Sequence, residues 1–154
     1  MDDNFARVLK EFGASLGLDD LQMDQDGYCA LRFDNVPVYI ELLGDRQHVL
    51  LHTCLGQVPT LADKDFYARL LHGNHFFART AGATIGVHPE SGSIDMATVL
   101  EGERMSLEGF ERALQVFVNT AEAWQRELGG DSSQVPDTSA APAERPMDWA
   151  SVRA

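Results

Sequence analysis

The sequence DKDFYARLLHGNHFFARTAGATIGVHPESGSIDM, residues 63–96, decides the fold. Its first half places apolar residues at helical spacing and predicts a helix near 62–77. Its second half predicts two short strands, 83–88 and 93–100, joined by the turn Pro89-Glu90-Ser91-Gly92. A proline early and a glycine late in a four-residue link are typical of a tight turn. The stretch therefore predicts a helix followed by a β-hairpin.

Three further strands are predicted upstream of this stretch, at 28–33, 36–43 and 48–55. Apolar residues recur at every second position of each strand, as in a sheet with one buried face. The links between the strands, Asp34-Asn35 and residues 44–47, have turn chemistry. We therefore expect an antiparallel meander, with a second face that is less polar than a solvated face.

Amphipathic helices are predicted at both ends of this region. A stripe of apolar residues predicts the first helix over 3–16, capped by Asp3 or Asn4. A longer stripe that ends near Trp124 predicts the last helix over 107–128, capped by Ser106. Pro59 and Thr60 are expected to open the middle helix.

The predicted element order is α-β-β-β-α-β-β-α, which is a single α+β domain over residues 1–129 with a twisted antiparallel sheet flanked by helices. Residues 130–154 are rich in serine, proline and alanine and contain few large apolar residues. This composition predicts a disordered C-terminal tail. Its last eight residues, MDWASVRA, regain Trp149 and Val152, so a short docking segment stays open as the alternative.

The charge of the chain argues against nucleic acid as a partner. The 154 residues carry a formal net charge of −12, which repels phosphate backbones. No apolar run approaches the ~18 residues of a spanning helix, and the N-terminus has no apolar signal core. Cys29 and Cys54 lie in separate strand-like runs and are expected to be buried and reduced. We therefore expect a cytoplasmic protein with no membrane contact.

The motifs of common enzymes are absent from the sequence. It contains no GxxxxGK[ST], GxGxxG, GxSxG or HExxH pattern. His72 and His75 share a helix face, but no third zinc ligand is identifiable near them. We therefore expect no enzymatic activity, no metal site and no cofactor.

Residues 63–96 resemble the CesT/Tir chaperone family, the class I chaperones of bacterial type III secretion. The likeness rests on the block Leu70-Leu71-His72-Gly73-Asn74, the small-residue step Thr80-Ala81-Gly82, and the strand, turn and strand that follow. The closing helix with Leu114, Phe117 and Trp124 also fits, and the resemblance extends over residues 1–128.

The resemblance implies a homodimer that uses no nucleotide and binds a secreted effector protein. The effector's N-terminal non-globular segment would wrap around the dimer in extended form, so that the effector stays soluble and competent for secretion. Delivery to the secretion machine makes the secretion-apparatus ATPase a further candidate partner. The alternative is a dimeric cytosolic domain of similar fold that acts as a regulator or binds a small molecule.

Two sets of site residues follow from the resemblance and from the surplus of apolar positions. The effector-binding candidates lie on the first helix and on strands 28–55: Phe5, Phe12, Phe33, Val38, Ile40 and Leu50. The dimer-interface candidates lie on the middle helix and the next strand: Leu70, Ile85 and Val87. The competing interpretation is that these side chains form the core of each subunit.

Overall fold

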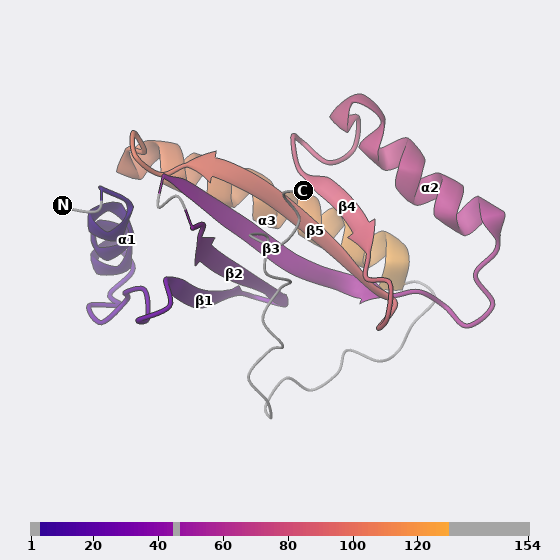
Figure 1. Ribbon diagram of the computed structural model, residues 1–154, viewed down its shortest axis with the longest axis horizontal. Helices are drawn as coiled ribbons and strands as arrows, with labels where there is room; N and C mark the ends of the chain where they lie inside the picture. The colour runs from indigo at the N-terminus through magenta and orange to yellow at the C-terminus, as the bar shows by residue number, and fades with distance from the viewer. Residues whose placement is uncertain (1–3, 45–46, 130–154) are drawn as a thin grey trace.

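The computed structural model describes residues 4–44 and 47–129, which form one α+β domain (Figure 1). The elements in chain order are α1 (Asn4–Ser15), β1 (Tyr28–Phe33), β2 (Val36–Leu42), β3 (His48–Gln57), α2 (Lys64–Asn74), the 3-10 helix η1 (His75–Phe77), β4 (Thr84–Val87), β5 (Ser93–Glu101) and α3 (Leu107–Gly129). This order confirms the predicted fold class. The tail assigned to residues 130–154 lies outside the described residues.

The five strands form one antiparallel sheet in the order β1-β2-β3-β5-β4. The predicted meander and hairpin are both present, and β3 joins them by pairing with β5 from His48↔Glu101 to Gln57↔Ser93. The edges of the sheet are therefore β1 and β4. Pro37 lies in the part of β2 that β3 does not reach, so its missing N–H costs no ladder bond on that side.

The hydrophobic core lies on one face of the sheet. Buried side chains of all three α-helices join a single cluster with the inward residues of the strands, such as Val38, Ile40 and Leu51. Phe110 of α3 is central, because the rings of Phe5 and Phe12 meet it edge to face at 5.3 and 5.2 Å. In Figure 1, α1 stands at one end of the sheet and α2 lies beyond β4 at the other.

Local chemistry explains where the helices begin. Ser106 caps α3 as predicted, since its Oγ accepts from the N–H of Gly109 at 3.0 Å. The start of α2 differs from the prediction, because Asp63, not Thr60, is the cap and accepts from the N–H groups of Asp65 and Phe66. Asn4 is the first residue of α1; its Nδ2 donates to the carbonyls of Gly102 and Met105, and its Oδ1 accepts from Nη2 of Arg7. Asp3, the other predicted cap, lies outside the described residues.

Candidate functional site

Helix α2 is held against α3 by a close approach of its backbone to an aromatic ring. A Cβ atom built on Gly73 would lie 2.7 Å from Cη2 of Trp124, so only glycine fits at this position. The indole Nε1 donates to the carbonyl of Arg79 at 2.8 Å, which also fixes the segment after α2. Trp124 therefore positions both sides of the turn that follows α2.

Asn74 ties the end of α2 to the edge strand β4. Its Nδ2 donates to the carbonyl of Ile85 and its Oδ1 accepts from the N–H of Ile85, both at 2.8 Å. The side chain thus pairs with the strand as a neighbouring strand would. This contact explains why asparagine follows the Leu-Leu pair in the sequence.

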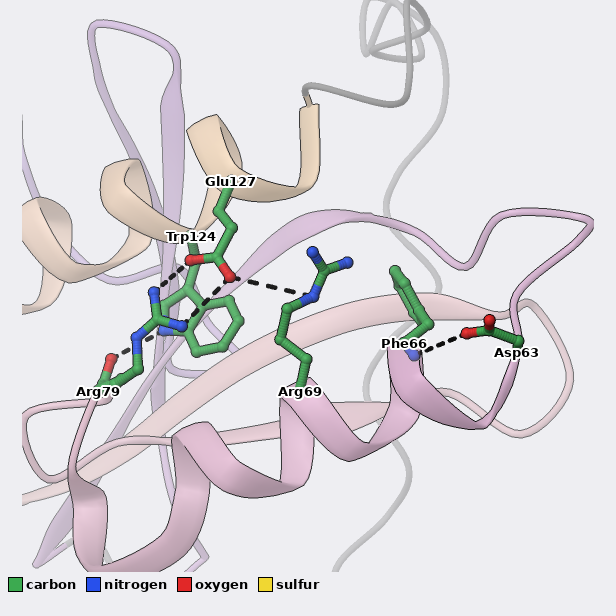
Figure 2. Close-up of polar contacts among 6 residues, drawn as sticks. All are labelled: Asp63, Phe66, Arg69, Arg79, Trp124 and Glu127. Carbon is green, nitrogen blue, oxygen red and sulfur yellow. Dashed lines mark hydrogen bonds and ion pairs between the residues drawn. The ribbon is translucent and has the colours of Figure 1, made fainter.

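An ion pair closes the same junction on its exposed side (Figure 2). Arg79 donates hydrogen bonds to Glu127 of α3, and its guanidinium lies over the ring of Trp124, 4.7 Å from the ring centroid. Arg69 is a second cation near the same carboxylate, with its Nε 4.0 Å from Oε1 of Glu127. The hydrogen bond from Arg79 lowers the pKa of Glu127, against the opposing effect of burial. The junction is therefore held by contacts on both its apolar and its charged side.

The outward side of this junction is apolar. We define the α2 surface as Tyr67, Leu71, Phe76 and Phe77, of which Leu71 is 67% and Phe76 87% exposed. Tyr67 and Leu71 are four residues apart on one helix and share a face. Phe76 and Phe77 both have positive φ, of 50° and 56°, which is costly for side chains of this size. Strain that turns two aromatic rings toward solvent is typical of a binding surface.

The face of the sheet opposite the core is a second apolar region. We define the outer face as Tyr28, Tyr39, Leu50, His52 and Val99. Tyr28 and Tyr39 stack at 6.1 Å and Tyr39 and His52 at 5.1 Å, which makes a ladder across β1, β2 and β3. Burial is the main cause that raises the pKa of Tyr28 to about 12, and burial also lowers the pKa of His52.

A hollow of about 340 Å³ lies on the helix side of the sheet, between α3 and β5. Ala83, Leu100, Ala113 and Phe117 form its apolar walls, and Thr80 and Arg112 are polar residues at its lining. The volume is within the range of small-molecule sites, but the hollow is open and holds no group of catalytic residues. Among residues 4–44 and 47–129, no three histidine, cysteine or acidic side chains are grouped as metal ligands.

The structure places most of the predicted effector-binding residues inside the protomer. Four of the six belong to the core cluster and are 5% exposed or less: Phe5, Phe12, Val38 and Ile40. Their alternation reflects packing of the subunit itself, which is the competing interpretation stated above. Phe33 is half-buried at the end of the edge strand β1, and Leu50 lies on the outer face, where it is also buried at 7% exposure. For these two residues, effector binding stays a prediction.

The predicted dimer residues divide in the same way. Leu70 and Ile85 belong to the core cluster, whereas Val87 at the edge strand is 37% exposed. The residues that reach solvent beside them are Leu71, Phe76 and Phe77, which were not among the predicted interface residues. The sequence contains a signal for them, because residues 66–77 include six large apolar or aromatic side chains, more than one stripe of a short helix can bury.

No helix among the described residues is long and apolar enough to span a membrane. The geometry thus defines a small α+β domain with exposed apolar surfaces, in which residues 4–44 and 47–129 bring together no cluster of metal-ligating groups. Comparison with known proteins agrees: the model of the Tir chaperone protein (CesT) family matches residues 7–125. The chain belongs to this family.

Relatives and solved structures support the assignment. The transcriptional anti-antiactivator ExsC of Pseudomonas aeruginosa is 29% identical over 129 residues, which cover 83% of this chain and 88% of ExsC. A chain of the crystal structure of the ExsC–ExsE complex has a TM-score of 0.70 at 29% identity and covers 82% of this chain and 95% of its own length. The HopA1–SchA chaperone–effector complex matches with a TM-score of 0.68 at 21% identity, over 82% of this chain and 97% of that chain, which shows the shared fold.

Proposed function

We propose that this protein is a cytoplasmic chaperone of type III secretion that binds the N-terminal, non-globular segment of a cognate effector and keeps it soluble. The observation that carries the proposal is the family match over residues 7–125, in a chain whose structural relatives include a chaperone–effector complex. The protein acts by binding and not by catalysis. Its acidity keeps a complex with an apolar client in solution.

The edge strand β1 is where we place the client segment. Within the described residues β1 pairs only with β2, so its outer backbone groups can accept a further strand. Leu31 and Phe33 are half-buried side chains on this strand, and the exposed Leu16 and Leu18 lie in the link that leads to it. A client strand on β1 would cover these apolar residues, which gains the free energy needed to order it.

The α2 surface supports a homodimer. Contacts on both sides hold α2 and η1 in place, so little ordering is required when the surface is covered. A second copy would bury Leu71, Phe76 and Phe77 together, with Val87 at the rim. A stable interface of this kind buries on the order of 1,600 Å².

A second candidate function is control of transcription. The observation that favours it is the 29% identity to ExsC, an anti-antiactivator, over most of both chains. Such a protein would bind a regulatory protein in place of, or in competition with, an effector. The same binding surfaces would serve both functions.

Capture from the native bacterium under secretion-inducing conditions tests the proposal. The full chain, tagged at its C-terminus, is expected to retain a larger protein through that protein's N-terminal region. Deletion of that region should abolish the complex. Capture of a regulator and no secreted protein would favour the second candidate, and capture of neither would contradict both.

A further inference from the structure

The outer face is unusually apolar for the free side of a sheet. An antiparallel sheet with its core on one side normally presents polar residues on the other. Here Tyr28, Tyr39, Leu50 and Val99 lie on that other side, while the buried side chains of the helices all join the opposite core. Leu50 faces Val99 across β3 and β5 in register, next to the ladder of rings.

His52, a polar residue of this face, also indicates a binding surface. The Nε2 atom of His52 is shielded from solvent without a hydrogen-bond partner in the structure, and burial lowers the pKa of this side chain. A neutral imidazole stacked on Tyr39 offers a donor or acceptor and a flat apolar surface. Such a surface fits an aromatic side chain that carries its own polar group, as the indole of tryptophan does.

The C-terminal end of α3 lies beside β3, so the rest of the chain leaves α3 near this sheet. Gln125 Nε2 donates to the carbonyl of Cys54 at 3.2 Å, so the last turns of α3 contact β3 two residues from His52. Residues 130–154 continue from there, and 17 residues separate Gly129 from Met147. At ~3.3 Å per extended residue this length exceeds the width of a sheet whose strands lie ~4.8 Å apart.

The chemistry of the chain's end matches the face. Met147 and Trp149 alternate with the polar Asp148, and Val152 follows, after a stretch rich in proline, serine and alanine. Arg153 adds a positive charge, and the outer side of β5 carries Asp95 and Glu101. This segment lies beyond the residues that the family model matches, so the family's shared fold does not account for it.

We propose that residues 147–152 dock on the outer face of their own protomer, with the indole of Trp149 against Tyr39, His52 and the exposed Val99. The segment covers the partly exposed rings of Tyr28 and Tyr39 and the exposed Val99, whereas Leu50 is only 7% exposed without it. A client segment that crosses the same face has to displace it. The C-terminal segment is in this way a built-in competitor, independent of the effector's identity and of the β1 edge.

Quenching of tryptophan fluorescence by acrylamide in the full chain tests this docking. The chain contains two tryptophans, of which Trp124 is 1% exposed. The fluorescence of a Trp149→Phe variant comes from Trp124 alone and is subtracted from that of the parent to give the signal of Trp149. We expect quenching of Trp149 to be several-fold weaker than in a synthetic peptide of residues 143–154. Equal quenching in the chain and the peptide overturns the proposal.

A matched pair of variants locates the docking site. Val99→Asp places a charge on the outer face at a residue that is 54% exposed, and Val116→Asp makes the same change on α3 at one that is 43% exposed. Val99→Asp should raise the quenching of Trp149 to the peptide's level, whereas Val116→Asp should leave it unchanged. Circular dichroism checks that both chains fold. Equal effects of the two variants on the quenching of Trp149 contradict the proposal. Protection of Trp149 that appears only as protein concentration rises also contradicts it, because the segment would then bind a second copy.

Discussion

Gly73 of α2 lies so close to the indole of Trp124 of α3 that the ring occupies the space of a side chain at position 73. The same indole donates its Nε1–H to the carbonyl of Arg79, six residues further along the chain. One buried ring thus holds both ends of the turn that carries Phe76 and Phe77. The exposed α2 surface depends on this internal contact.

Gly73→Ala is expected to destabilise the protein by about 1–3 kcal/mol, because the added methyl forces α2 away from a packed ring that cannot yield. The free energy of unfolding, from urea denaturation followed by circular dichroism, measures this cost. Gly86→Ala is the matched control, since no atom lies within 4 Å of a Cβ at that position. Equal stability of the two variants would show that α2 tolerates a shift away from Trp124.

Asn74→Ala is expected to cost about 1–3 kcal/mol, because it leaves the N–H and carbonyl of Ile85 without the amide that pairs with them. Hydrogen exchange of the Ile85 amide should accelerate as well, which separates a local opening of β4 from general loss of stability. Asn119→Ala, on the exposed side of α3, should change neither quantity. Unchanged exchange at Ile85 would contradict the bridging role of Asn74.

The ion pair between Arg79 and Glu127 predicts a small dependence of stability on pH. Because the folded-state pKa of Glu127 is lowered, its contribution is present above the unfolded pKa and is lost as pH falls through the folded one. Both side chains are partly exposed, so Glu127→Gln should cost less than about 1 kcal/mol at neutral pH. The difference in unfolding free energy between parent and variant should shrink toward zero in acid. A difference that stays constant between neutral and acidic pH would assign the effect to packing instead.

The order of the elements could be predicted from the sequence because each one rests on local chemistry. The turn at Pro89–Gly92 and the cap at Ser106 act within four residues, and both strand and helix periods are visible without knowledge of the partners. Assigning Leu70 to the core and Leu71 to the surface required knowledge of a tertiary contact. The two are adjacent and equally apolar, yet Leu70 packs in the core and Leu71 faces solvent, because the contact of Gly73 with Trp124 sets the rotation of α2.

The site was harder to predict for a related reason. An apolar stripe shows that a helix is buried on one side, but not whether a neighbour in the same chain or a partner covers it. Phe5 and Phe12 of α1 are covered by Phe110, about one hundred residues away in sequence. Only the tertiary contact separates such a core residue from a groove residue.

If the α2 surface forms the dimer interface, Leu71→Glu should prevent dimerisation. A charge at this exposed position leaves the protomer intact but must be buried without a partner in the interface, which weakens association strongly. Sedimentation equilibrium at micromolar concentration should give a dimer for the parent and a monomer for the variant. Leu16→Glu, 52% exposed in the segment after α1 at the far end of the sheet, is the control and should stay dimeric. A monomeric parent would contradict the dimer itself.

Phe12→Ala and Phe33→Ala separate the core from the client groove. Phe12 is 5% exposed and packs edge to face on Phe110, so its removal should cost about 3–5 kcal/mol and unfold much of the population. Phe33 lies half-buried at the edge strand, so Phe33→Ala should keep most of the thermal stability and weaken the client complex by about 1–2 kcal/mol. Circular dichroism melts and co-purification of the captured client measure the two effects side by side. If Phe33→Ala loses client and fold together, the ring is part of the core and the groove lies elsewhere; if it loses neither, the β1 edge is not the binding strand.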